Sequence, residues 1–289
     1  MGKIVILAET GSDLPKETAE RYGIELVPMH VTFGDITLED GTFPVEEICN
    51  YYAKNKELPK TSGCSPEDFR IIFDAIHEKY PEKHIIHLAY SAVTTCSYQS
   101  ALIAAEDRDY ITSIDTRQVS AGQSIIIIRT AEMLEKYPDI TLPEVIKTVE
   151  TFCLQTRMCF IPEDLEYLKA GGRVSNVVFL GGRLLNIHPS IEIENGYLIA
   201  KKKYRGRMER IAIKLLEEFT KKENLEKEHL WLLWSIGLPI EVRNIVEQTA
   251  MKLGYKKISW IQTGCVITSH GGPGAFGIAG FTEESEDNK

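Results

Sequence analysis

The sequence has no long hydrophobic run. Its longest uninterrupted aliphatic stretch covers residues 125–128, whereas a helix that spans a bilayer needs about 20 consecutive apolar residues. The amino-terminal residues lead directly into a strand-like stretch at residues 3–8, without the basic, apolar and small-residue regions of a signal peptide. We therefore expect a cytoplasmic protein without an integral membrane segment.

Cysteine is sparse and scattered. None of the six cysteines belongs to a Cys-x-x-Cys pair, and zinc sites usually depend on such close pairs. A chain of 289 residues can bury enough apolar surface to fold without disulfides or a structural metal. We expect six reduced thiols, no metal site and an ordinary globular protein, since 43% of the residues are hydrophobic and 26% are charged.

Positive charge is outnumbered by negative charge. The chain has 33 Lys and Arg residues against 42 Asp and Glu residues, which gives a formal net charge of −9. An acidic surface repels the phosphate backbone of DNA and RNA. This balance argues against nucleic acid as the main partner.

The common catalytic and nucleotide-binding motifs are also missing. The sequence contains no Walker A, Gly-x-Ser-x-Gly or His-Glu-x-x-His motif. Residues 272–277 match Gly-x-Gly-x-x-Gly, but a dinucleotide site also needs a following helix and an acidic strand end about 20 residues further on. Only 12 residues follow Gly277, so we predict no nucleotide cofactor and assign no catalytic residue.

Strand-like and helix-like segments alternate in the first half of the chain. Helix starts are marked by Ser65 before Pro66 and by capping boxes at residues 120–123 and 141–144. His84 and His87 should lie on opposite faces of one strand, one partly buried and one solvated. The expected strands are residues 3–8, 25–33, 84–89 and 110–114, and the expected helices are residues 14–22, 66–79, 97–106, 120–137 and 141–153. This alternation predicts an α/β fold, with a mostly parallel sheet flanked by helices over residues 1–157.

The second half mixes hairpin and helix signals. Asn195-Gly196 is the strongest short hairpin signal, and it joins two expected strands within residues 184–203. The other expected elements are helices at residues 162–169, 208–222 and 240–253 and strands at residues 229–235 and 257–263. This half therefore predicts a C-terminal α+β domain over residues 158–289, packed against the first domain.

Four loops combine hydroxyl residues, glycines and lone basic groups at the expected ends of strands. They cover residues 59–65, 91–100, 170–175 and 269–274. Ligands of α/β domains bind outside the carboxyl ends of the strands. Hydroxyl and backbone N–H groups near helix starts bind anions, and Arg or His adds charge-assisted donors. Together the loops predict a site for a modest anionic group, either a carboxylate or a phosphate.

The same loops carry a resemblance to the DegV family that extends over nearly the whole chain. Six segments resemble family motifs in the right order. They are residues 8–15 (T-D-S-x-x-D-L-P), 59–65 (P-x-T-S-x-P-S), 91–100 (L-S-S-x-L-S-G-T-Y-Q-S), 171–175 (G-G-R-I-S), 185–189 (L-x-I-K-P) and 270–277 (H-x-G-P-G-x-x-G). The main departure is Thr95-Cys96, which stands where the motif has Ser-Gly. Glu9 also stands where the first motif has Asp.

The resemblance is to the fatty-acid-binding subunit of bacterial fatty acid kinase. It implies a two-domain fold that encloses one long-chain fatty acid, with the tail in an apolar tunnel and the carboxylate near the domain junction. A separate kinase subunit would phosphorylate the bound acid to an acyl phosphate. The residues carried over to the head group are Thr61, Ser62, Thr95 and His270, and Arg173 would face the head group or the docked kinase. The chain would then be a carrier rather than an enzyme, with the fatty acid in place of any other cofactor.

Two further functions stay open at this point. A hydrolase or acyltransferase could use Thr95 or Ser62 as a nucleophile with His270 as its base, although the sequence assigns no acidic partner to the histidine. The site could also hold a different small anion, such as a phosphorylated metabolite.

Overall fold

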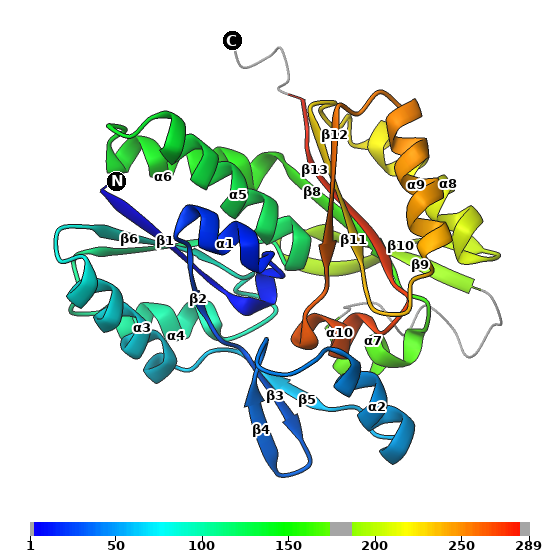
Figure 1. Ribbon diagram of the computed structural model, residues 1–289, viewed down its shortest axis with the longest axis horizontal. Helices are drawn as coiled ribbons and strands as arrows, with labels where there is room; N and C mark the ends of the chain where they lie inside the picture. Colours follow the sequence, from blue (N-terminus) through cyan, green and yellow to red (C-terminus); the bar gives the residue numbers. More distant parts are fainter. Residues whose placement is uncertain (1–2, 174–186, 284–289) are drawn as a thin grey trace.

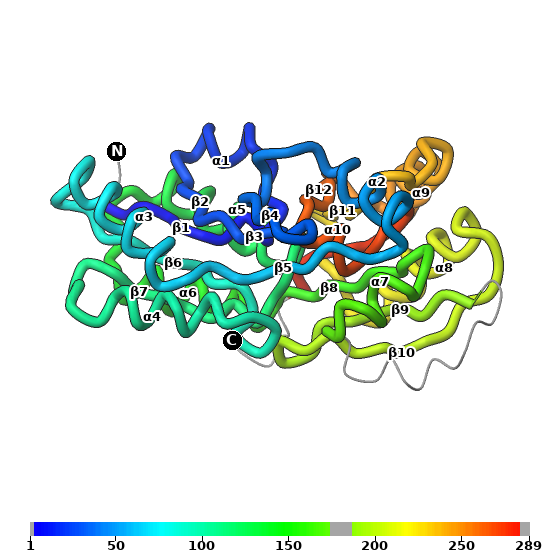
Figure 2. The backbone as a smooth tube through the Cα atoms, turned by 90° about the horizontal axis from the view of Figure 1, so that it is seen from below, coloured from blue at the N-terminus to red at the C-terminus, as the bar shows by residue number. Residues whose placement is uncertain are grey.

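Two β-sheets with helices on their faces make up most of the molecule (Figure 1). The computed structural model describes residues 3–173 and 187–283. One sheet comes from the first half of the chain and the other from the segment after Thr156, and the two lie side by side along the long axis of the molecule (Figure 2). A parallel sheet with helices and a second sheet with its own helices confirm the predicted fold class.

The first sheet is parallel throughout, with strand order β2-β1-β6-β7. Successive residues of β1 point to opposite faces, so that Ile6 packs toward α5 while Val5 and Leu7 pack toward α3 and α4. A strand covered on both faces needs the continuous apolar run that the sequence shows here. The strands are β1 (Ile4–Glu9), β2 (Glu25–Val27), β6 (His84–Ala89) and β7 (Ile111–Asp115), and the helices are α1 (Lys16–Tyr22), α3 (Pro66–Lys79), α4 (Ser97–Ala105), α5 (Ser120–Lys136) and α6 (Leu142–Gln155).

The second sheet is mixed, with strand order β10-β9-β8-β13-β11-β12. Only β11 and β12 pair in parallel, and the other neighbours are antiparallel. Asn195 and Gly196 both have positive φ, at 49° and 85°, as the predicted tight turn between β9 and β10 requires. The strands are β8 (Thr156–Ile161), β9 (Ile187–Glu194), β10 (Tyr197–Arg205), β11 (His229–Trp234), β12 (Lys257–Gln262) and β13 (Phe276–Phe281), and α8 (Met208–Lys222) and α9 (Ile240–Lys252) cover one face.

Helix α5 connects the cores of the two sheets. Its residues Ile125, Ile126 and Ile127 are fully buried, and they share one hydrophobic cluster with side chains of β1 and β6 and with side chains of β8, β11 and β13. A helix that is apolar around most of its circumference is one that is buried on most sides. Its first residue, Ser120, therefore lies at the junction of the two sheets.

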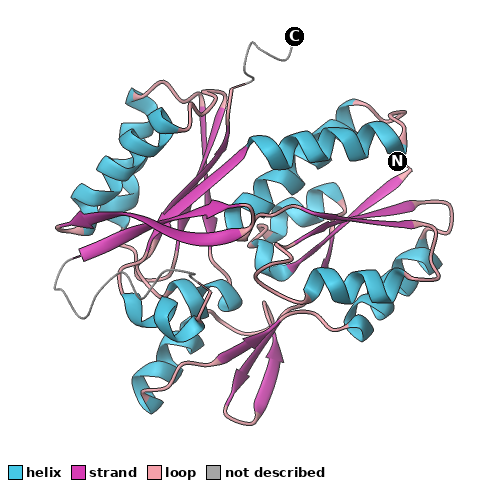
Figure 3. Cartoon of the chain, turned by 180° about the vertical axis from the view of Figure 1, so that it is seen from behind, coloured by secondary structure: helices cyan, strands magenta, loops and turns pink. Residues whose placement is uncertain are grey.

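A smaller unit lies below this junction and projects from the rest of the molecule (Figures 1 and 3). It is a three-stranded antiparallel sheet of order β4-β3-β5 with helix α2 beside it. Its elements are β3 (His30–Phe33), β4 (Ile36–Glu39), α2 (Glu46–Asn55) and β5 (Lys60–Ser62), and the short helices η1 (Thr10–Ser12), α7 (Leu165–Gly171) and α10 (Cys265–Gly271) complete the described elements. Helix α10 contacts α2, α7, β3 and β5.

Three sequence-based predictions of local structure are wrong. Residues 25–33 form two strands in different sheets, because Pro28 cannot donate to a ladder and the Met29 N–H bonds the Thr10 hydroxyl instead (3.0 Å). Residues 120–123 form no capping box, since Ser120 has a φ of 46° and its hydroxyl donates to Asp13. Neither histidine of β6 is solvated, because His87 is fully buried and His84 is half-buried.

The other helix starts agree with the sequence. The capping boxes at Ser65 and Thr141 are confirmed, with Asp68 and Glu144 as their acidic members. The boundary between residues 157 and 158 stays a prediction, and it falls within β8. Two of the motif segments, residues 171–175 and 185–189, lie partly outside the described residues, which exclude Val174, Ser175, Leu185 and Asn186. The acidic residues beyond Glu283 also lie outside them.

Candidate functional site

A pocket of about 790 Å³, including its open mouth, lies where the two sheets and the smaller unit meet. All five residues singled out from the sequence line it: Thr61, Ser62, Thr95, Arg173 and His270. They come from β5, from the loop before α4, from the residue after Gly172 and from α10.

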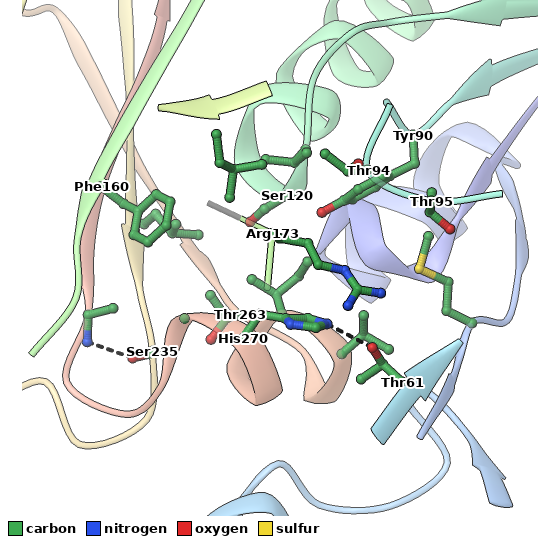
Figure 4. Close-up of a pocket in the computed structure, with 18 of the residues that line it drawn as sticks. Thr61, Tyr90, Thr94, Thr95, Ser120, Phe160, Arg173, Ser235, Thr263 and His270 are labelled. Carbon is green, nitrogen blue, oxygen red and sulfur yellow. Dashed lines mark hydrogen bonds between the residues drawn. The ribbon is translucent and has the colours of Figure 1, made fainter. Parts of the chain in front are cut away.

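One end of this pocket is polar. His270 Nε2 lies 2.7 Å from Thr61 Oγ1 (Figure 4). The Arg173 side chain passes between Tyr90 and His270, and Arg173 is exposed, which places it at the mouth. This end therefore offers hydroxyl groups, one imidazole and one guanidinium to an anion, and no carboxylate lines the pocket among the described residues.

The imidazole of His270 is neutral at pH 7. Burial, and secondly the positive charge of Arg173, lower its pKa to about 4 from the ordinary value of 6.5. The Nδ1 atom has no hydrogen-bond partner among the described residues, and it lies so close to Gly171 that any Cβ there would clash with the ring. Because buried N–H groups without a partner are rare, we assign the proton to Nε2, which donates it to Thr61. The Thr61 hydroxyl proton is then left for a ligand.

This geometry does not support the hydrolase alternative. His270 contacts Thr61 rather than Thr95 or Ser62. In a Ser-His-Asp arrangement a carboxylate holds the second ring nitrogen, but here that nitrogen faces the backbone of Gly171. A ring with a pKa of about 4 is also a weak general base at neutral pH.

The other end of the pocket is apolar. Side chains of β8, β10, β11 and the start of α5 line it, and they belong to the core that joins the two sheets: Val119, Met158, Phe160, Leu198 and Leu233. Ser235 also lies at this end, but its hydroxyl accepts the Ala275 N–H at 2.7 Å (Figure 4). The wall therefore suits a hydrocarbon rather than a second polar group.

Two buried acids hold the helix that carries His270, and the sequence analysis missed this role. Asp13 accepts the Gly264 N–H at 2.7 Å, and Asp40 accepts the N–H groups of Cys265 and Val266 at 3.0 and 3.4 Å. Burial, and more weakly the charge of Asp40, raise the pKa of Asp13 well above its ordinary value, while bonds from Ser120 and Gly264 oppose the rise. Asp13 belongs to the D-L-P motif, so the sequence marked the residue without revealing its partner.

The loop that carries Thr95 rests on a buried pair from β1 and β6. Glu9 Oε1 lies 3.3 Å from His87 Nε2, and both side chains are fully buried. The other carboxylate oxygen of Glu9 accepts the N–H of Tyr90, the first residue of the loop, at 2.9 Å. On the opposite side, the Ser91 hydroxyl donates to the carbonyl of Gly196 in the β9–β10 turn (2.9 Å). The loop is thus fixed to both sheets.

Within residues 3–173 and 187–283, no three His, Cys, Asp or Glu side chains come together in a way that could hold a metal ion. Over the same residues, no helix is long and apolar enough to cross a membrane.

The whole chain is similar to known proteins. A model of the DegV family, described as uncharacterised proteins, matches residues 3–283. A fatty acid-binding protein of Thermotoga maritima is 30% identical over 287 residues, which cover 96% of this chain and 96% of the relative.

Solved structures give the same picture. A DegV-family protein from Thermus thermophilus, described for its fatty acid binding, matches with a TM-score of 0.87 at 25% identity, over 97% of this chain and 100% of the other. A stearic acid-binding protein from Eubacterium ventriosum matches with a TM-score of 0.79 at 25% identity, over 98% of each chain. The family model spans both sheets and all four loops that line the pocket, and this chain therefore belongs to the DegV family.

Proposed function

We propose that this protein is a carrier that encloses one long-chain fatty acid. The carboxylate lies among Thr61, Ser62, Thr95 and His270, and the tail runs toward Phe160 between the predicted domains, residues 1–157 and 158–289. The observation that carries the proposal is the polarity of this pocket, which has hydroxyl groups, His270 and Arg173 at one end and core side chains at the other. The names of the relatives from Thermotoga, Thermus and Eubacterium support it.

The energetics favour an enclosed tail over a strongly charged head-group site. Each CH₂ group that leaves water contributes about 0.8 kcal/mol, so a long chain supplies most of the affinity. The head group then needs few contacts. The neutral imidazole of His270 and the neutral hydroxyl groups can bind the carboxyl group through hydrogen bonds, without an opposite charge against it. This suits a carboxyl group that is chemically modified while the fatty acid is bound.

That modification is phosphorylation by a separate kinase subunit in the cytoplasm. In this proposal the chain supplies no catalytic residue and presents the carboxylate at the pocket mouth, where Arg173 lies. A guanidinium is suited to bind phosphoryl oxygens or an acidic partner surface through paired N–H groups. The kinase would transfer a phosphoryl group to the carboxylate oxygen and release the acid as acyl phosphate.

Mass spectrometry of molecules released from the denatured protein tests the carrier function. We expect one fatty acid per chain after purification, because a tail buried in an apolar pocket dissociates slowly. Recovery of a phosphorylated metabolite without lipid would replace the fatty acid by the other anionic ligand. A protein that is empty and fails to take up added stearic acid would also contradict the proposal.

Arg173→Ala should separate binding from phosphorylation. We expect fatty-acid content to fall by less than threefold, since the tail supplies most of the affinity, whereas kinase turnover should fall by at least tenfold, the loss typical of one missing charge-assisted contact. Lipid content and acyl phosphate formation are measured on the same samples. Lys169→Ala, which removes a nearby exposed positive charge outside the pocket lining, is the matched control. Normal turnover with an emptied pocket would reverse the assignment of Arg173.

A further inference from the structure

Two hydroxyl groups of the pocket are already used as donors inside the protein. The Ser120 hydroxyl donates to Asp13, and the Thr94 hydroxyl donates to the Ser91 carbonyl at 2.9 Å. A hydroxyl has one proton, so neither residue has a second one to give to a ligand. Thr95 lines the same pocket with a different set of partners.

The hydrogen-bond partners of Thr95 form a short chain of hydrogen bonds. It begins at the backbone N–H of Cys64, two residues after the end of β5. The Cys64 N–H donates to Ser97 Oγ at 3.0 Å. Ser97 Oγ lies 3.2 Å from Thr95 Oγ1, and the Ser97 N–H also approaches Thr95 Oγ1, at 3.4 Å. Ser97 itself is fully buried and does not line the pocket.

The direction of this chain follows from the burial of Ser97. A backbone N–H can only donate, so Ser97 Oγ accepts from Cys64. Among the described residues, Thr95 Oγ1 is the acceptor that the fully buried Ser97 hydroxyl reaches, and a buried O–H without an acceptor is costly, so we assign the proton between them to Ser97. Thr95 Oγ1 then accepts from Ser97, and its own proton has no acceptor within the chain. Gly63 leaves room for both hydroxyls, because a Cβ at this position would clash with Thr95 Oγ1 and Ser97 Oγ.

We propose that Ser97 is a positioning residue, which orders the Thr95 hydroxyl as a proton donor and so makes the pocket select acyl ligands with an ionised, acceptor-only head group. The inference rests on the proposed fatty-acid site and adds a residue that does not touch the ligand. An ionised carboxylate accepts hydrogen bonds and donates none, whereas an alcohol does both. A hydrogen bond to a charged group is also roughly twice as strong as one between neutral groups.

A double-mutant cycle with two ligands of equal chain length tests the proposal. Affinities of stearic acid and stearyl alcohol are measured by displacement of fluorescent cis-parinaric acid from the wild type, Ser97→Ala, Thr95→Val and the double variant. For Ser97→Ala we expect stearic acid to bind at least tenfold more weakly and stearyl alcohol about threefold more weakly. Because Ser97 acts through Thr95, the double variant should be no weaker than Thr95→Val alone.

Three further measurements keep the outcomes distinct. Ser97→Thr keeps the hydroxyl and should retain the preference for the acid, while Ser100→Ala removes another buried serine of α4 and should change neither affinity. In Ser97→Ala the Cys64 N–H loses its acceptor, and the melting temperature measures the resulting loss of stability. A loss of stability by itself would weaken the binding of both ligands to the same extent. Equal weakening of both ligands, or additive losses in the double variant, would overturn the role of Ser97. A wild-type protein that binds neither ligand would overturn the fatty-acid carrier proposal instead.

Discussion

Gly272→Ala should lower the free energy of unfolding by about 3 to 5 kcal/mol and the melting temperature by about 10 °C. Gly272 ends α10 with φ 75° and ψ 171°, a region of the backbone map that only glycine occupies readily. A Cβ there would also lie 2.9 Å from Cδ2 and 3.0 Å from Cγ of Tyr167. Tyr167 is only 4% exposed, so its ring cannot move aside without disturbing the packing of α7 on α10.

The neighbouring glycine provides a matched control for this effect. Gly271 also lines the pocket, but a Cβ there would meet no atom within 4 Å, and its φ is not positive. Gly271→Ala should therefore change the free energy of unfolding by less than about 1 kcal/mol. Thermal and urea unfolding of both variants give the comparison. Equal losses for the two variants would show that the backbone conformation of Gly272 and its contact with Tyr167 do not limit stability.

The sequence predicts best those elements whose signals are local. Helix α8 spans residues 208–222 as expected, because its apolar residues repeat at helical spacing on one face. The turn at Asn195-Gly196 was also found, since both residues must take positive φ. These features depend on a few neighbouring residues and need no knowledge of the partner elements.

The missed elements depend on distant parts of the chain. Strand β5 has only three residues and is a strand because it pairs with β3. Strand β13 contains glycines where close approach is needed: a Cβ on Gly277 would lie 2.9 Å from the Cys159 carbonyl, and glycine weakens the usual strand signal. Helix α10 is short, and acids from two remote loops hold its first N–H groups. No local pattern could reveal these pairings.

The residues of the candidate site could be predicted from local motifs, but the residues that support them could not. The motif segments marked Thr61, Ser62, Thr95, Arg173 and His270, and the structure brings all five to one pocket, although their contact with a fatty acid stays a proposal. The roles of the residues behind them do not follow from the sequence. Ser97 is joined to Cys64, Gly171 lies against His270, and Glu9 lies against His87, and each of these partners is remote in the chain.

Glu9→Gln should cost about 3 kcal/mol of stability at pH 7, because hydrogen bonds to a charged group contribute about 1.5 to 3 kcal/mol and an amide oxygen accepts those of Tyr90 and Gln123 more weakly than the carboxylate does. The amide keeps the size of the side chain and an oxygen for the Tyr90 N–H, so the variant removes mainly the charge that faces His87 at 3.3 Å. Glu25→Gln is the control. Its ion pair with Lys79 is exposed and long, at 3.8 Å, and exposed pairs contribute less than about 1 kcal/mol.

The pH dependence identifies the origin of this loss. Burial alone would raise the pKa of Glu9, but the attraction of His87, followed by hydrogen bonds from Tyr90 and Gln123, holds the pKa below its ordinary value of 4.5. A carboxyl group with a lowered folded-state pKa stabilises the fold fully above its unfolded-state pKa, and this stabilisation disappears as the pH falls through the folded-state value. The gap in unfolding free energy between wild type and Glu9→Gln should thus be constant from pH 7 to about 5. It should shrink below about 4.5, where Glu9 in the unfolded chain takes up a proton, until folded Glu9 is also neutral below its lowered pKa. A gap that stays unchanged at pH 3 would mean that the amide disturbs packing under the Tyr90 loop and that the charge of Glu9 contributes nothing. A gap that closes would show that the buried charge of Glu9 supports the loop on which Thr95 and Ser97 lie.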